Sequence, residues 1–175
     1  MNWYVELVKA HPILTAIVQF AILGTVGDII AKLIIQKNWK YPFSLVMTLW
    51  KMVVWSILAV CIKYAFIGIN GFVVALMEHG LLPQMALGTI GFAFAKSALV
   101  NLQFGLFLVL FHRILDNLVL TEKNWKNLDK GMLSLLWFWI PAHTVTFSLP
   151  TDFQIGLAAV WSVVLGFILG IFNRK

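Results

Sequence analysis

The chain contains a single cysteine and few charged residues. Cys61 stands alone among 175 residues, which excludes an intrachain disulfide and a thiolate metal cluster supplied by one chain. Charged residues make up 11% of the chain, whereas a soluble domain usually has about 25%. Hydrophobic residues reach 61%, and the mean hydropathy is +0.91. This composition excludes an ordinary soluble domain and predicts an integral membrane protein whose main partner is the lipid bilayer.

The chain also lacks the motifs of the common catalytic and cofactor sites. It has no G-x-S-x-G elbow, H-E-x-x-H pair, P-loop or dinucleotide fingerprint. The histidines are scattered and no two are spaced i, i+4: His11, His79, His112 and His143. We therefore expect no enzyme activity, no metal site and no cofactor.

Five apolar segments follow one another along the chain. A helix needs about 20 apolar residues to span the hydrocarbon core of a bilayer. The segments are Pro12–Ile35, Phe43–Ile67, Met85–Leu115, Met132–Leu149 and Phe153–Phe172. Residues 68–83 contain the breakers GING and EHGLLP and are predicted to interrupt the helix. The sequence predicts a single transmembrane helical domain over residues 1–175, an all-α bundle of four transmembrane helices plus a short Pro-containing membrane segment.

That short fourth segment leaves two topologies open. If it crosses as a fifth span, one side of the membrane carries the basic residues Lys37, Lys40, Arg113, Lys123, Lys126, Lys130, Arg174 and Lys175. If it re-enters, the last two move to the other side. The positive-inside rule favours a crossing, and the short, Pro-broken run favours re-entry. Because flanking basic residues set topology, the net charge of +6 does not predict a nucleic-acid partner.

A carboxylate, Asp28, lies inside the first apolar segment. A charge at the centre of a membrane helix costs about 3 kcal/mol on insertion scales, so such residues are functional-site candidates. Lys32 is one helical turn later on the same face and is the nearest candidate partner. Two interpretations stay open: the pair lines a polar cavity or pore, or it is a neutralised structural pair that fixes helix packing.

A second polar set lies inside the third apolar segment. Lys96, Ser97, Asn101 and Gln103 are spaced to share one broad helix face. A polar face in a membrane helix turns toward the bundle interior or water, and a cationic one favours anions. The set is predicted to line a pore or cavity, with internal packing as the alternative. Lys51 and Lys63 lie closer to segment ends and are expected to reach the interface.

Three residues of the fourth segment are candidates for a gate or pore mouth. Trp139, Pro141 and His143 combine an aromatic ring, a helix-breaking residue and a group that titrates near neutrality. A packing role for His143 is the alternative.

Short motifs resemble one family of small membrane proteins. His11-Pro12, Thr15 and Gly27-Asp28 match the pattern HP-x-x-T … GD near the start of the Mpv-seventeen/peroxisomal membrane protein twenty-two family. Weaker matches lie in the distal half, at Lys96, Asn101, Asn124-Trp125, Trp139, Pro141, Phe147, Pro150 and Trp161. The chain departs from the pattern at Lys32, Leu102, Ile140, Thr146 and Gln154, as a divergent member would.

The resemblance implies a four-helix protein of the mitochondrial inner membrane or the peroxisome. It also implies a weakly selective channel with a role in membrane or organelle homeostasis. The predicted function is a small channel or pore that permits the passage of small solutes or metabolites. The alternatives are a non-conducting structural or partner-binding membrane protein and, for location, a prokaryotic inner membrane. Association into a homo-oligomer is left open.

Overall fold

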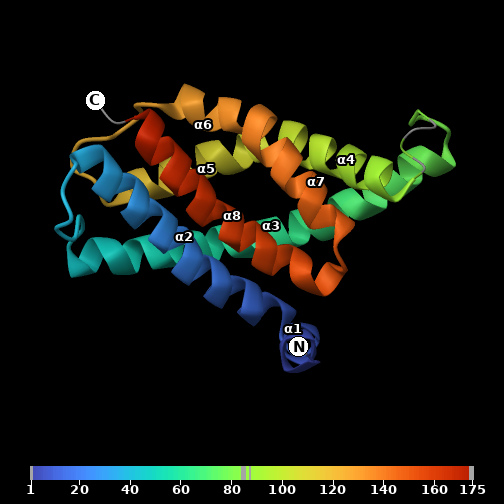
Figure 1. Ribbon diagram of the computed structural model, residues 1–175, viewed down its shortest axis with the longest axis horizontal. Helices are drawn as coiled ribbons and strands as arrows, with labels where there is room; N and C mark the ends of the chain where they lie inside the picture. Colours follow the sequence, from blue (N-terminus) through green and yellow to red (C-terminus); the bar gives the residue numbers. More distant parts are fainter. Residues whose placement is uncertain (1, 84–85, 87, 174–175) are drawn as a thin grey trace. The chain divides into compact units, whose positions relative to one another are not determined.

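The computed structural model describes residues 2–83, 86 and 88–173. Within this part of the chain every regular element is a helix (Figure 1). The elements are α1 (Asn2–Ala10), α2 (Pro12–Gln36), α3 (Leu45–Glu78), α4 (Thr89–Leu99), η2 (Val100–Gly105), α5 (Leu106–Leu118), α6 (Leu128–Ser134), η3 (Leu135–Trp139), α7 (Ile140–Ser148) and α8 (Thr151–Phe172). The predicted all-α membrane fold is confirmed.

Four helices are long and apolar enough to cross a membrane: Pro12–Gln36, Leu45–Glu78, Thr89–Leu118 and Thr151–Phe172. They coincide with four of the five predicted apolar segments. The predicted start of the third segment, Met85, lies outside the described residues. So do Arg174 and Lys175, which entered the topology argument.

The predicted break after Ile67 is wrong. The helix α3 continues through GING to Glu78 and is 34 residues long. An internal glycine costs a helix only about 1 kcal/mol, which apolar neighbours offset. The chain turns only at Gly80, whose φ of +64° is a left-handed conformation that glycine adopts without a Cβ clash.

The fourth segment is one continuous helical run over α6, η3 and α7, and it begins earlier than the sequence predicts. Pro141 is the second residue after the wide π-helical turn η3 (Leu135–Trp139). A proline inside a regular α-helix clashes with the preceding turn, and a π-helical turn adds a residue that relieves this constraint. The helix α7 packs alongside α4 (Figure 1). Pro141 therefore does not break the segment in two.

The described chain forms two compact units. The first unit comprises Met1–Val60 and Ile155–Lys175, and the second comprises Cys61–Gln154. Each is described separately below. The single transmembrane domain inferred from the sequence stays a prediction.

In the first unit, small residues bring α2 and α8 into backbone contact. A Cβ added at Gly166 would meet the backbone of Gly27, and one added at Gly27 would lie 2.6 Å from the carbonyl oxygen of Ser162. Small residues at a helix interface are the usual route to close packing in lipid, where no hydrophobic effect drives helices together.

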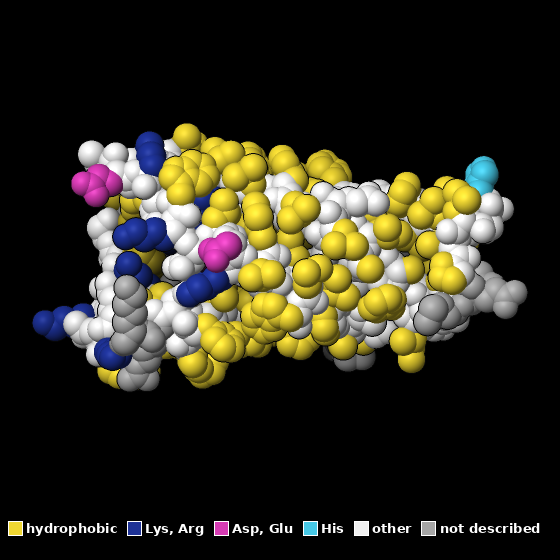
Figure 2. Space-filling model, turned by 90° about the horizontal axis from the view of Figure 1, so that it is seen from above, with side chains coloured by type: hydrophobic (Ala, Val, Ile, Leu, Met, Phe, Trp, Pro, Cys, Tyr) yellow, Lys and Arg dark blue, Asp and Glu magenta, His cyan; other side chains and the backbone are white. Residues whose placement is uncertain are grey.

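Apolar side chains cover the outer surface of these helices. On α2 a stripe spaced i, i+4 is exposed: Leu14, Val18, Ile22 and Val26. The same helix buries Ala16, Phe20 and Gly24 on another face. Figure 2 shows hydrophobic side chains over much of the face in view. Lipid is the solvent for such a surface, so its exposure agrees with a membrane protein.

Candidate functional site

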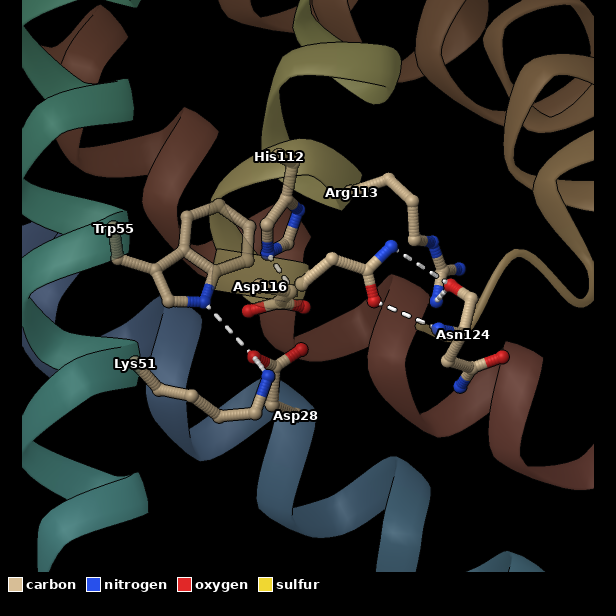
Figure 3. Close-up of polar contacts among 8 residues, drawn as sticks. Asp28, Lys51, Trp55, His112, Arg113, Asp116 and Asn124 are labelled. Atoms are coloured by element: carbon tan, nitrogen blue, oxygen red, sulfur yellow. Dashed lines mark hydrogen bonds and ion pairs between the residues drawn. The ribbon is translucent and has the colours of Figure 1, made fainter. Parts of the chain in front are cut away.

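The first unit contains an ion pair between two helices. Lys51 Nζ on α3 donates to Asp28 Oδ2 on α2 over 2.8 Å, and Trp55 Nε1 donates to the same oxygen over 3.2 Å (Figure 3). The Lys51 and Asp28 side chains are 11% and 24% exposed. A charge-assisted hydrogen bond of this length compensates both charges where water is scarce.

Helix packing selects this partner for Asp28. Gly24 lies one turn earlier on α2, and a Cβ there would lie 2.5 Å from Trp55 Cγ. The Trp55 ring also stacks on Phe20, with centroids 6.1 Å apart. Lys51 and Trp55 are therefore held over α2, whereas Lys32, the partner expected from spacing, is exposed. Lys51 binds this carboxylate, and its expected position at the membrane interface stays a prediction.

The second unit contains a buried lysine with neutral neighbours. Lys96 on α4 is 3% exposed. Its Nζ donates to Asn70 Oδ1 over 3.3 Å and lies 4.3 Å from the centroid of the Phe147 ring. Among the residues that the structure describes, no Asp or Glu side chain forms an ion pair with Lys96.

A polar seam continues from Lys96 along the same helix. Ser97 Oγ donates to the carbonyl oxygen of Ile140 over 2.7 Å, which ties α4 to α7. Asn101 Nδ2 donates to the Ser97 carbonyl oxygen over 2.8 Å and contacts His143 Nδ1 at 3.1 Å. An amide nitrogen only donates, so Nδ1 of His143 is the acceptor. Both Nδ2 hydrogens of Asn101 are thereby used.

Aromatic rings surround the His143 imidazole. The Trp139 ring centroid is 4.9 Å away, and the Phe66 and Phe147 centroids are 5.3 and 5.7 Å away. Phe66 meets the imidazole edge-on and belongs to the part of α3 that lies in the second unit. The Asn101–His143 contact is therefore one polar link in apolar surroundings, where a hydrogen bond is stronger than in water.

Two π-helical turns flank the seam. The turn η2 carries Asn101, and η3 precedes Pro141 and His143. The two turns contact each other, and a Cβ added at Gly105 would lie 2.8 Å from a methyl carbon of Leu135. Single π-helical turns inside α-helices are frequent at functional sites. Both π-helical turns of the described chain lie in the second unit.

The residues predicted from the sequence separate into three groups. Asn101 and Trp139 contact His143 in the second unit, and the Phe147 ring lies against both His143 and the Lys96 ammonium. Lys96 and Asn101 are buried. Asp28 is bound in the first unit. The third group is exposed: Lys32, Gln103 and Pro141. Gln103 shares a face with Lys96 on an ideal α-helix, but it lies inside η2, whose wider turn changes the helical phase.

Sequence reasoning missed Asn70 as a partner of Lys96. Asn70 lies in the GING tetrad, which looked like a helix breaker because glycines flank it. The sequence signal that could have identified Asn70 is its polar side chain within an apolar stretch. Its place on the surface of a helix follows from the continuation of α3 to Glu78.

Beside the seam lies a recess of about 260 Å³. It is lined by Asn101, Leu102, Leu106, Met132, Leu133, Leu135 and Leu136. Because Asn101 is the sole polar member of this lining, the recess suits hydrocarbon. In the part of the chain that the structure describes, no group of three His, Cys, Asp or Glu residues could hold a metal ion.

Comparisons with protein-family models, with curated proteins and with solved structures find no match.

Proposed function

We propose that this protein is a small channel or pore that lets small solutes or metabolites cross its membrane. The observation that carries the proposal is Lys96, a buried cation in an apolar helix with neutral partners in the described chain. Ionisable residues inside membrane helices are rare and mark substrate or ion pathways.

The cost of burying Lys96 is the reason for this choice. A buried charge is strongly unfavourable unless a counter-charge and hydrogen bonds offset it. The pair between Asp28 and Lys51 meets that condition, and Lys96 does not. A methionine would fill a similar volume without a charge, so a role in packing alone does not account for an ammonium group.

The proposed path follows the polar seam of the second unit. Lys96, Asn101 and His143 line it, and Trp139 and Pro141 shape its mouth. Conduction through such a path requires that solutes bind weakly enough to leave. Rearrangement at the π-helical turns η2 and η3 would open it. Lining by Asp28, Lys32 and Gln103 stays a prediction from the sequence.

The motif resemblance supports an organelle location. The GD motif at Gly27-Asp28 and the HP motif at His11-Pro12 resemble the Mpv-seventeen/peroxisomal membrane protein twenty-two family. We therefore propose the mitochondrial inner membrane or the peroxisome, with a role in membrane or organelle homeostasis. A prokaryotic inner membrane is the alternative.

Solute flux in liposomes tests the proposal. Purified protein is reconstituted, and release of small charged and neutral solutes is compared with that from protein-free liposomes. We expect faster release with protein. Release equal to that of the protein-free liposomes, from protein shown to be folded and inserted, contradicts the proposal.

A non-conducting structural or partner-binding protein is the second candidate. One observation favours it: both donors of Asn101 are satisfied inside the protein, and the recess beside it is apolar. In this alternative the seam only holds α4 and α7 together, and flux stays at the protein-free level.

A further inference from the structure

The Lys96 ammonium keeps hydrogen-bonding capacity that its neighbours do not use. An ammonium has three N–H donors. The structure gives Nζ one acceptor, Asn70 Oδ1 at 3.3 Å, and one π-face, the Phe147 ring at 4.3 Å from its centroid. Positive charge and donor capacity therefore remain for a ligand with negative charge.

Asn70 places a second donor beside this ammonium. Its Oδ1 is used by Lys96, and no contact of Asn70 in the described chain uses its Nδ2 hydrogens. An amide Nδ2 and an ammonium Nζ on neighbouring side chains match the two oxygens of a carboxylate, which accepts bonds at both.

Asn70 also provides access. It is exposed, although Lys96 is 3% exposed. At 1.5 Å per residue, the 34 residues of α3 extend about 51 Å, whereas a hydrocarbon core is about 30 Å thick. The helix is therefore longer than the hydrocarbon is thick, and Asn70 lies eight residues before its end at Glu78. Asn70 is the accessible member of the pair that it forms with Lys96.

Apolar rings complete the surroundings. Phe147 covers one side of the ammonium, and Phe66 packs edge-on against Phe147 with centroids 4.7 Å apart. Both rings are buried, at 7% and 5% exposure. A ligand with a charged end and a short hydrocarbon end fits this combination better than a strongly hydrated inorganic ion does.

We propose that Lys96 and Asn70 form a binding site for a small carboxylate anion. This inference rests on the proposed function, because it names the class of solute that the path carries. The ligand carboxylate is the counter-charge for Lys96, as the Asp28 carboxylate is for Lys51. Its bond to Nζ is a charge-assisted hydrogen bond that uses N–H donors left over by the bond to Asn70 Oδ1.

Binding is tested without any flux measurement. The purified protein in detergent micelles is titrated with trifluoroacetate, a small carboxylate whose ¹⁹F line broadens on binding. We expect broadening that acetate reverses by competition and that choline chloride at equal ionic strength does not. Broadening that acetate fails to reverse in the wild-type protein overturns the proposal.

One variant locates the site, and a second serves as its matched control. Lys96→Met removes the ammonium, and loss of a hydrogen bond to a charged group should weaken binding at least about tenfold. Lys63→Met is the control, because it removes one lysine charge from α3 in the second unit and leaves Lys96 in place. Equal binding by both variants, or equal loss in both, overturns the assignment.

Asn70→Asp provides a test that does not depend on removing Lys96. The new side chain gives Lys96 a counter-charge from the chain itself and removes the Nδ2 donor proposed for the ligand. We expect binding to fall as far as in Lys96→Met, while the variant folds at least as stably as wild type. Undiminished binding by folded Asn70→Asp contradicts the proposal.

Liposome flux then separates this inference from the proposed function. Carboxylate flux that falls in both Lys96→Met and Asn70→Asp, but not in Lys63→Met, supports both. Flux that occurs without carboxylate binding, and is unchanged in these variants, refutes the carboxylate site and leaves the channel intact. Binding without any flux refutes the channel alone.

Discussion

The two units surround a lysine inside an apolar helix differently. In the first unit, Lys51 has a carboxylate at 2.8 Å and an indole N–H that shares the same oxygen. In the second unit, Lys96 is more deeply buried, and the described residues give its ammonium an amide oxygen and an aromatic ring. A buried charge with a counter-charge can be explained by structure alone, whereas one without a counter-charge is the kind of group that motivates the proposed path and ligand site.

The two units also differ in the regularity of their helices. Glycines hold α2 and α8 of the first unit in close contact, with regular α-helical turns throughout that contact. The second unit has two π-helical turns that face each other next to its polar seam. Regular, tightly packed helices resist rearrangement, while π-helical turns allow a local change of helical phase. Four predictions test this contrast.

Removal of Asp28 should have the largest effect. Asp28→Ala removes the carboxylate that lies 2.8 Å from the largely enclosed Lys51 ammonium, which should lower the free energy of unfolding by about 3 kcal/mol. Reversible unfolding in mixed micelles of mild detergent and SDS measures it. The double variant Asp28→Ala, Lys51→Met should recover most of the loss. A double variant as unstable as the single one would show that Asp28 acts through something other than this pair.

Overpacking of the α2–α8 contact should have the next largest effect. Gly166→Val places a side chain against the backbone of Gly27, where only a shift of the helices could make room. We expect a loss of about 2 kcal/mol in unfolding free energy, the middle of the range for overpacked cores. Gly88→Ala is the control, since a Cβ there meets no atom within 4 Å. Equal losses in both variants would contradict close packing at Gly166.

Removal of the Lys96 charge should change stability in the opposite direction. Lys96→Met removes a poorly compensated buried charge and should raise the free energy of unfolding by about 1 kcal/mol. The same unfolding assay measures the change, and liposome flux should fall at the same time. A large loss of stability would show that Lys96 is a structural residue like Lys51, and the contrast between the units would disappear.

The smallest effect concerns the glycines of the GING tetrad. Gly71→Ala meets no neighbouring atom within 4 Å and lies inside the helix α3. The change should stabilise the protein by about 0.5–1 kcal/mol, because alanine loses less conformational freedom in a helix than glycine does. Amide hydrogen exchange of residues 66–76 should slow. Faster exchange would indicate that α3 bends at this glycine when the protein works.

Much of the candidate site was predictable, but its partners were not. Lys96, Asn101 and His143 stand out as polar residues in apolar segments, and burial of the first two follows from that. The bond between Asn101 and His143 depends on the alignment of two helices that are distant in the chain. The exposure of Gln103 depends on the π-helical turn η2, and no residue pattern in its sequence VNLQFG predicts that turn.

The sequence by itself determined that this is an all-α membrane protein, because hydropathy over about 20 residues is a local property that decides whether a helix can cross a bilayer. It also determined which polar residues lie in apolar segments. Only the tertiary structure decided that Asp28 binds Lys51 and that Lys96 meets Asn70. The partner of a buried charge depends on the rotation and depth of packed helices, and these follow from contacts such as Gly24 beneath Trp55 and from the π-helical turns of the second unit.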